Sequence, residues 1–381
     1  MASVGSAVEA SSKAPAGAHP EAAPGKRILL ISNRLMHYRV SVYNYFWRHF
    51  REHGWDFVVM TNEVQRENQN QCQFELIQKP FAFSQYRAEV KRLKPDAVIL
   101  FLHMRDRIQW PLIHWLKLSC IPVAVWTKAR NLDDVDNRVR NFFFDYLHAI
   151  SDGLILYTAS LDRFIKPRYR KKVFVANNTI NFEDFPPISE SKGEIKRDLG
   201  IPFQKVVLFA GRIGEEKNRK KVDHLIDMFR DLDRSDVGLV IVGSGLNPEL
   251  AARMNPANTR YLGEVHDPEN RQISRIFKMA DVCSIPGHVG LGLNQAFFWG
   301  LPMVTEHGNQ PPEIEYLRDG ENGFMVAEDD RPALRERVLR LLDNDEERRR
   351  MSENARRDIL ANASIEGMFA GFLACARHLA R

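Results

Sequence analysis

Short apolar runs alternate with amphipathic helical patterns along the chain. In the first half, five runs rich in Val, Ile and Leu predict strands, and the segments between them carry apolar residues at helical spacing. The predicted strands are residues 27–32, 57–60, 97–102, 123–126 and 153–157, and the predicted helices are residues 40–50, 86–93, 110–118 and 141–149. Apolar strands that alternate with helices are typical of a parallel sheet covered on both faces.

The same alternation restarts after residues 181–191, a polar stretch with two prolines that is typical of a linker. The second series predicts strands at residues 206–210, 238–242, 281–285 and 303–305, and helices at residues 222–232, 293–299 and 346–359. We therefore predict an α/β protein of two Rossmann-like, doubly wound parallel-sheet domains that face a cleft. Ligands are expected where the carboxyl ends of the strands meet the cleft.

The pattern divides the chain into four segments. Residues 1–25, rich in Ala, Ser, Gly and Pro and without aromatics, predict a disordered tail and not a signal peptide. Residues 26–186 and 187–363 are the two predicted domains. Residues 364–381 predict a closing helix, and the pattern leaves open whether it packs on the first domain or ends the second.

The net charge of +5 hides an asymmetry between the domains. Residues 26–186 hold 25 Lys and Arg against 16 Asp and Glu, whereas residues 187–381 hold 28 against 31. Aromatic residues lie among the cations of residues 38–51, namely Tyr38, Tyr43, Tyr45, Phe46 and Trp47 beside Arg39, Arg48 and Arg51. Such a face suits anionic lipid headgroups or an acidic acceptor. Solvated charges above core aromatics are the alternative interpretation of each residue.

The chain offers no strong metal, disulfide or membrane-spanning pattern. Its four cysteines are far apart and form no CxxC pair, which favours a reducing, cytoplasmic setting. The acidic run at residues 133–136 is interpreted as a solvated loop or a helix start and not as a metal site. No apolar run approaches the ~20 residues that a membrane span needs.

Two cations follow the first predicted strand of the second domain. Arg212 and Lys217 come directly after Gly211, five residues apart across a turn. The planar guanidinium and the compact ammonium could converge on one anion, such as a diphosphate whose charge grows as it leaves. Surface ion pairs with Glu215 and Glu216 are the alternative.

Two glycine-rich turns follow later strands of the same domain. The turn Gly243-Ser-Gly245 leaves room for a ligand to approach the backbone, but it lacks the third glycine of a dinucleotide-binding fingerprint. The loop through Val289, Gly290 and Leu291 opens into a helix, whose free N–H groups and dipole would form an anion cradle. A tight connection without a ligand is the alternative.

In their order, these blocks resemble the family-4 glycosyltransferases of the GT-B architecture. The resemblance covers residues 206–326, and a weaker resemblance extends over residues 28–46. It rests on the Gly-Arg turn with Lys217, Gly243-Ser-Gly245, Leu262-Gly-Glu-Val265, Ala280-Asp-Val282, the loop around Gly290, Gly300-Leu-Pro302, Pro312-Glu-Ile-Glu315 and Asn322-Gly-Phe324.

The resemblance implies that the second domain binds a nucleotide-diphosphate sugar and the first domain an acceptor. It implies that Arg212 and Lys217 hold the donor diphosphate, and that Glu264 and Val265 lie against the base. The Gly211, Gly243 and Gly245 turns would line the donor site, and the backbone of Val289, Gly290 and Leu291 would meet the phosphates and the sugar. Enzymes of this kind retain the anomeric configuration by front-face attack and need no metal or other cofactor.

The sequence departs from the family pattern at two places. The usual pair of glutamates falls on Gly287 and Gln295. Gln295 can still bond a ribose hydroxyl, and His288 or Glu313 is expected to replace the missing contact to the sugar. A histidine that often follows a first-domain strand is replaced by Lys128, a fixed cation. An acidic donor sugar or a phosphorylated acceptor would suit this change, and a neutral sugar with rearranged contacts is the alternative.

On the acceptor side, residues 33–39 are expected to form a loop that faces the cleft. His37 and Arg39 in this loop, and His103 after another strand, are candidates for contacts with the acceptor or the donor phosphate. The expected acceptor is lipid-linked, a polysaccharide or another saccharide, with peripheral contact to an anionic inner membrane surface and no nucleic-acid partner. The alternatives are a small-molecule (natural-product) glycosyltransferase, a sugar-nucleotide epimerase and a non-catalytic nucleotide-sugar binder.

Overall fold

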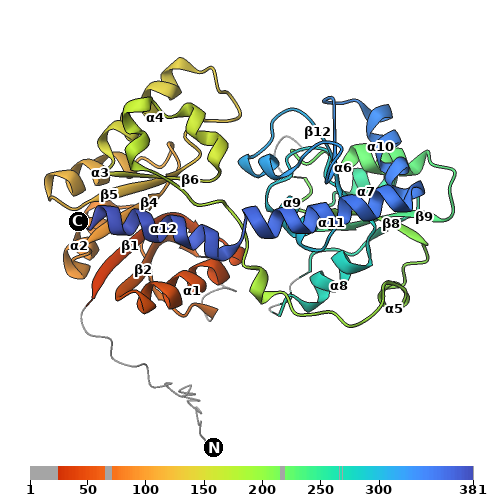
Figure 1. Ribbon diagram of the computed structural model, residues 1–381, viewed down its shortest axis with the longest axis horizontal. Helices are drawn as coiled ribbons and strands as arrows, with labels where there is room; N and C mark the ends of the chain where they lie inside the picture. Colours follow the sequence, from red (N-terminus) through yellow and green to blue (C-terminus); the bar gives the residue numbers. More distant parts are fainter. Residues whose placement is uncertain (1–24, 65–70, 215–218, 266, 268, 381) are drawn as a thin grey trace, which may run out of the picture.

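Two parallel sheets, each with helices on both faces, form the two domains of the protein (Figure 1). The computed structural model describes residues 25–64, 71–214, 219–265, 267 and 269–380. The first sheet has the strand order β3-β2-β1-β4-β5-β6-β7 and the second has the order β10-β9-β8-β11-β12-β13. The predicted α/β fold of two Rossmann-like domains is therefore confirmed.

The first sheet is buried on both faces. Its strands are β1 (Lys26–Leu35), β2 (Trp55–Val64), β3 (Glu75–Gln78), β4 (Ala97–Phe101), β5 (Val123–Thr127), β6 (Gly153–Leu156) and β7 (Val173–Val175). Along β1, Ile28 and Leu30 point into one apolar cluster while Leu29 and Ile31 point into another. Because successive side chains alternate between the two faces, a strand covered on both sides is apolar at every position.

Helices from both ends of the chain cover this sheet. One face carries α1 (His37–Glu52) and α12 (Ile365–Leu379), and the other carries α2 (Phe83–Leu93), α3 (Gln109–Leu118) and α4 (Arg138–Ile150). β1 runs on to Leu35, which pairs with Val64 of β2, and the Arg34 side chain lies 2.6 Å from Glu63 of the same strand. The expected loop at residues 33–39 is therefore wrong, since α1 begins at His37 and only Met36 separates the two elements.

The second domain repeats the arrangement around one large apolar cluster. Its strands are β8 (Lys205–Ala210), β9 (Val237–Val242), β10 (Thr259–Tyr261), β11 (Val282–Ser284), β12 (Met303–Glu306) and β13 (Gly323–Val326). Its α-helices are α5 (Lys192–Asp198), α6 (Val222–Arg230), α7 (Pro248–Arg253), α8 (Arg271–Met279), α9 (Leu291–Phe298), α10 (Arg331–Asp343) and α11 (Asp345–Asn362). Short 3₁₀ segments complete the chain: η2 (Ala159–Phe164), η3 (Pro167–Lys172), η4 (Phe182–Asp184) and η5 (Pro312–Tyr316).

The chain crosses between the domains twice, and the two crossings touch. The Asn177 side chain donates to the carbonyl of Asn362 at 2.5 Å. Ile180 and Phe182 already belong to the core of the second domain, so the first crossing lies ahead of the predicted boundary at residue 186. At the second crossing, Ala363 packs in the second core.

The closing helix α12 packs on the first domain, across β6 and β7, as the blue helix in Figure 1 shows. Two glycines allow the close approach. A Cβ on Gly371 would lie 2.3 Å from the Val175 carbonyl oxygen, and one on Gly153 would lie 2.8 Å from the Cys375 sulfur. One 18-residue window within Asp345–Leu379 is apolar enough for a membrane span, contrary to expectation, but half of that window is buried inside the protein. A core helix therefore accounts for its apolar character.

Candidate active site

The first two strand ends of the second sheet pack backbone against backbone. A Cβ on Gly243 would lie 1.9 Å from the carbonyl oxygen of Gly211, and one on Gly245 would lie 2.0 Å from that of Ile213. The Ile213 N–H donates to the Ser244 carbonyl at 2.7 Å. The glycines are thus required for contact between neighbouring turns, and this contact fixes the backbone that carries the exposed Arg212.

A lysine that the sequence analysis did not select reaches this site. Lys217 lies outside the described residues, whereas Lys220 crosses Gly211, where a Cβ would lie 2.8 Å from its Cδ. The Lys220 ammonium donates to the carbonyl oxygens of His288 at 2.9 Å and Val289 at 3.3 Å. Lys220 follows Arg219 and precedes Lys221 directly before the helix that begins at Val222, so spacing in the sequence does not distinguish it from its cationic neighbours.

The glycine loop after β11 leads into an uncapped helix start. Gly290 has φ +57° and ψ −150°, a conformation that only glycine adopts readily, and as the N-cap residue it offers no side chain to cap α9. The first N–H groups of a helix lack intrahelical acceptors and attract anions. Among the described residues, the only neighbouring atom within 4 Å of a Cβ on Gly290 would be the His288 Nδ1, at 3.9 Å. The Val289 N–H, by contrast, donates to Gln310 at 3.2 Å.

Gly287 stands in a position that has no room for a side chain. A Cβ there would lie 2.0 Å from the carbonyl oxygen of Arg219. The Gly287 N–H donates to the Lys220 carbonyl at 3.1 Å, and the His288 N–H donates to the Arg219 carbonyl at 2.7 Å. The backbone of residues 219–220 therefore fills the space that a glutamate at this position would need.

An ionic cluster around the buried Glu306 anchors the start of α6. Lys221 has φ +50°, and its ammonium lies 3.1 Å from Glu306 and 2.7 Å from Asp329. His224 Nδ1 lies 2.6 Å from the other Glu306 oxygen. Burial opposes ionisation of Glu306, but hydrogen bonds from His224, the Asp329 N–H and Lys221 outweigh it and hold the pKa of that carboxyl below its usual value. Ligand atoms of His224, Glu306 and Asp329 lie within 4.8 Å of one another, yet a metal would have to displace the Lys221 ammonium.

Glu313 lies at the junction of the two domains. It is 4% exposed and accepts a hydrogen bond from the Asn178 side chain, whose oxygen accepts in turn from Arg39 at 2.8 Å. The relay Arg39–Asn178–Glu313 thus joins α1, the first crossing and η5. Glu313 is therefore tied to this junction, which does not favour the expected direct contact with the sugar.

Arg39 is buried, contrary to the expectation that it faces an acceptor. Its guanidinium lies 4.5 Å from the centre of the Trp126 ring, and its side chain is 3% exposed. The Nε and Nη1 atoms have no hydrogen-bond partner among the described residues, so the aromatic face takes their place. His37 is exposed and packs edge-on against Tyr38 at 5.4 Å. Neither residue lines the pocket described next.

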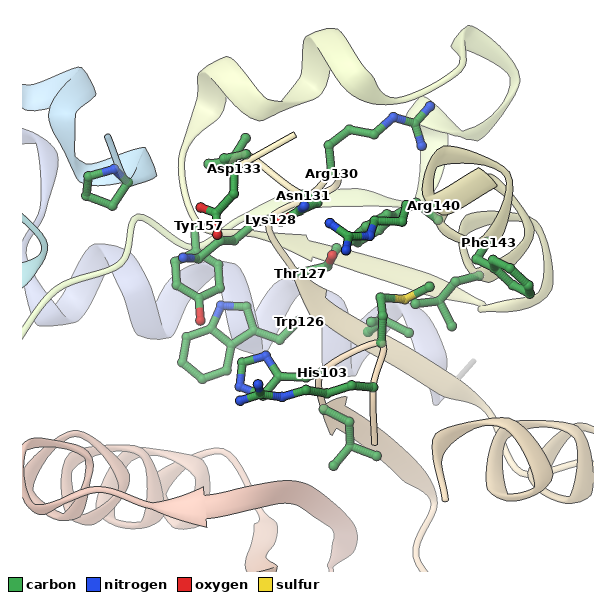
Figure 2. A pocket seen from close by; sticks show the side chains of 18 of the residues that line it. His103, Trp126, Thr127, Lys128, Arg130, Asn131, Asp133, Arg140, Phe143 and Tyr157 are labelled. Carbon is green, nitrogen blue, oxygen red and sulfur yellow. The ribbon is translucent and has the colours of Figure 1, made fainter. Parts of the chain in front are cut away.

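A pocket of about 720 Å³ lies at the carboxyl ends of β4 and β5 and extends to the second domain (Figure 2). Among the residues that the structure describes, its lining holds five cations and one carboxylate, together with a wall of apolar side chains. The cations are Arg105, Lys128, Arg130, Arg140 and Arg219, and the carboxylate is Asp133. The apolar wall includes Phe101, Leu102, Met104, Trp110, Phe143, Phe144 and Leu147. The pocket therefore suits an amphiphilic or anionic ligand.

Figure 2 shows the Arg140 side chain reaching from α4 into the pocket, between Phe143 on one side and Lys128 and Tyr157 on the other. The Lys128 ammonium lies 5.7 Å from the centre of the Tyr157 ring. Arg130 is held in place by Asp145 at 2.6 Å. Of the predicted residues, the pocket brings together Lys128, His103 and His288.

Both histidines of the pocket are neutral at neutral pH. Burial lowers the pKa of His288 to about 3, and the charges of Arg219 and Lys128 act in the same direction. Burial likewise lowers the pKa of His103, and Asp106 opposes this only in part. Each imidazole can therefore donate one hydrogen bond and accept another, but it adds no charge.

Asp133 joins the two domains at the edge of the pocket. One of its oxygens accepts from Asn309 at 2.8 Å and lies 3.3 Å from Arg219. Burial opposes its ionisation, but the bond from Asn309 and the charges of Arg219 and Lys128 outweigh burial and hold the pKa of this carboxyl below its usual value. The acidic run thus supplies a contact between domains and is not merely solvated.

The remaining predicted residues lie around the strand ends of the second sheet. Glu264 is exposed and Val265 half-buried after β10, and Gln295 is half-buried on α9. Leu291 is the first residue of α9 and packs at the edge of the second core. These positions share one edge of the sheet because all its strands are parallel.

Comparison with known proteins places this site in context. Residues 204–344 match the family model described as "Glycosyl transferases group 1". The chain is 24% identical over 216 residues to spore coat protein SA of Bacillus subtilis, covering 51% of this chain and 56% of that protein. It is 22% identical over 326 residues to the Campylobacter jejuni GalNAc-alpha-(1->4)-GalNAc-alpha-(1->3)-diNAcBac-PP-undecaprenol alpha-1,4-N-acetyl-D-galactosaminyltransferase, covering 80% and 82%. The alignments span 56% or less of the first five curated relatives.

Solved structures match over nearly the whole chain. Anabaena HepE in complex with UDP superposes with a TM-score of 0.73 at 13% identity, covering 92% of this chain and 99% of HepE. The fold is that of the GT-B glycosyltransferases. The part of the chain that matches the glycosyl transferases group 1 model is the second domain, with the turns, the glycine loop and Lys220.

Proposed function

We propose that the protein is a metal-independent, retaining glycosyltransferase of family 4. The second domain binds a nucleotide-diphosphate sugar, the first domain binds the acceptor, and the sugar passes between them. The proposal rests on one observation above all: Lys220 and the uncapped start of α9 converge at the glycine loop, at the edge of the sheet that faces the first domain.

The chemistry follows from the charge that the leaving diphosphate gains. As the glycosidic bond breaks, negative charge grows on the phosphate oxygens. Three positive groups are available to stabilise this charge: the Lys220 ammonium, the first N–H groups of α9 and the guanidinium of Arg212. Because the charge is larger in the transition state than in the ground state, these groups stabilise the transition state more. In this proposal the acceptor hydroxyl attacks from the face that the nucleotide leaves, so no covalent intermediate forms.

The acceptor is proposed to bind in the pocket beside Lys128 and His288. His288 can accept a hydrogen bond from the acceptor hydroxyl because its imidazole is neutral. The excess of cations in the pocket supports an acceptor that carries phosphate over a neutral one. A lipid-linked or saccharide acceptor fits this chemistry, and the named Campylobacter relative supports the lipid-linked class. A small natural product is the competing acceptor.

The proposed location is the cytoplasm, at the inner face of the membrane. Cys120, Cys283 and Cys375 form no disulfide among the described residues, as expected of a reducing compartment. Metal independence is tested directly: turnover that survives exhaustive treatment with EDTA is expected, and turnover restored only by a divalent ion would contradict this part of the proposal.

Purified protein and a panel of UDP-, GDP- and TDP-sugars test the proposed activity. Slow donor hydrolysis in the absence of acceptor is expected with at least one sugar nucleotide, and it should disappear in the Lys220→Ala variant. Neutral and acidic sugars should be compared in the same panel. Absence of hydrolysis and of transfer with every donor would overturn the proposal.

A non-catalytic nucleotide-sugar binder is the second candidate, and Gly287 favours it. The site has no carboxylate where the family pattern has its first glutamate, and none fits there. Tight binding of a sugar nucleotide by calorimetry without turnover would support this candidate. Conversion of the donor sugar into its epimer would instead identify a sugar-nucleotide epimerase.

A further inference from the structure

An exposed apolar stripe runs along α4. Val139, Phe142, Phe143 and Tyr146 stand at positions i, i+3, i+4 and i+7, so they share one face of the helix. Their side chains are 68%, 66%, 43% and 37% exposed. A surface helix of a globular protein normally turns such a stripe toward its core. The residues that α4 buries are Leu147 and His148 instead.

The stripe continues onto α3 through ring contacts. The Trp110 ring lies 5.7 Å from Phe143 and 6.4 Å from Tyr146. We call Trp110, Val139, Phe142, Phe143 and Tyr146 the α4 shelf. Rings that are partly exposed and packed on one another present a firm, amphipathic surface, typical of side chains at a membrane interface.

Cations flank the α4 shelf. Arg138 and Arg140 are exposed on α4 itself, and Arg105 lies on the loop before α3. The one carboxylate on α4, Asp145, is neutralised by Arg130 at 2.6 Å and Lys166 at 2.9 Å. The first domain also carries the basic surplus of the chain. An apolar stripe beside arginines matches an anionic lipid surface, where the rings enter the headgroup region and the guanidinium groups bind phosphates.

The α4 shelf is continuous with the acceptor pocket. Trp110 and Phe143 belong to both, and Arg140, which flanks the shelf, also lines the pocket, so the shelf forms the outer rim of the pocket. The aromatic face that the sequence analysis expected at residues 38–51 cannot play this part. Tyr43, Tyr45 and Phe46 are at most 4% exposed and lie in the core.

We propose that the α4 shelf docks on an anionic lipid bilayer and thereby holds the pocket against the membrane. The occupant is the lipid surface, because its anionic headgroups complement the arginines while its acyl region accepts the rings. The further step, that the pocket draws the phosphate-bearing head of a lipid-linked acceptor from that surface, rests on the proposed function.

Flotation of the full chain with phosphatidylcholine vesicles that contain phosphatidylglycerol tests the docking. Binding at low salt is expected, with at least a tenfold decrease when phosphatidylglycerol is omitted or salt is raised. The Val139→Ser/Phe142→Ser variant should lose at least tenfold in binding. These two residues do not line the pocket, and because they are exposed the variant should fold normally. Leu360→Ser is the matched control, since Leu360 on α11 is 42% exposed and lies on the other domain.

Three results would overturn the docking proposal, two of them from flotation. One is failure of the unaltered protein to float with anionic vesicles at low salt, and the other is equal binding by the double variant. Light scattering tests whether a second copy of the chain covers the shelf instead of a membrane. A dimer that dissociates in the double variant, together with no vesicle binding by the unaltered protein, would also overturn the docking proposal. Donor hydrolysis in vesicle-free solution separates the two proposals. The hydrolysis rate should be unchanged in the double variant. If the unaltered protein floats with vesicles but hydrolyses no donor, the result would count against the proposed function and not against the docking proposal.

Discussion

Gly287 packs so closely against the backbone of Arg219 that a Cβ on Gly287 would lie only 2.0 Å from the Arg219 carbonyl oxygen. The two segments are also joined by the hydrogen bonds from Gly287 to Lys220 and from His288 to Arg219. The missing family glutamate is therefore no isolated substitution. The backbone of Arg219 and Lys220 occupies the space that a side chain at residue 287 would need.

The Gly287→Ala variant should therefore be strongly destabilised. The added methyl group cannot avoid the Arg219 backbone, and overpacking of this kind costs about 1–3 kcal/mol or more. Thermal unfolding should show a clear fall in Tm. Gly193→Ala is the control, because its nearest atom would be 3.9 Å away and the residue lies in α5. An unchanged Tm for Gly287→Ala would contradict the packing described here.

Removal of the Lys220 ammonium should impair the proposed reaction. Lys220→Ala deletes the cation that touches the glycine loop, and loss of one such group typically lowers kcat about 10²-fold or more. Arg212→Ala is expected to act in the same direction. Steady-state kinetics with the best donor measure both effects, and Lys91→Ala on the exposed surface of α2 is the control. Unchanged kcat/KM in Lys220→Ala would refute its role.

The relay between the domains should behave as one unit. Arg39 and Glu313 are both buried and joined through Asn178, so removal of one charge leaves the other less well compensated. Arg39→Met and Glu313→Gln should each lower stability, and the double variant should lose less than the sum by at least about 0.5 kcal/mol. Urea unfolding measures this coupling. Additive effects would show that the two charges act independently.

Acid should destabilise the protein through buried histidines. His148 is 1% exposed, and burial lowers its pKa to about 4. Between that value and the ordinary pKa near 6.5, the unfolded chain binds more protons than the folded one, so stability falls as pH falls, by up to about 1.4 kcal/mol per pH unit for each such group. His148→Phe should flatten the acid limb of a Tm–pH curve relative to the unaltered protein. His53→Phe, at an exposed position, is the control. An identical slope in His148→Phe would contradict the assignment.

The central strands of both sheets are evident from the sequence, whereas the strands at the four sheet edges are not. β3, β7, β10 and β13 are the outermost strands, and each has three or four residues. A central strand is apolar throughout because helices cover both of its faces, while β3, β7 and β10 are partly exposed. The fold class could thus be predicted from nine apolar runs, although the sheets are wider than those runs indicate.

The candidate site divides in the same way. The order of glycines and cations along the second domain was sufficient to predict that a ligand site lies at its strand ends, because parallel strands bring these segments to one edge. The tertiary structure decided that Lys220 reaches the loop, that Arg39 lies under Trp126, and that the shelf on α4 faces outward. Aromatic and basic residues look alike in sequence whether they face the core or the solvent. The distinction depends on which distant elements pack on them. Helix α12 covers α1, whereas Val139 and Phe142 on α4 remain 68% and 66% exposed.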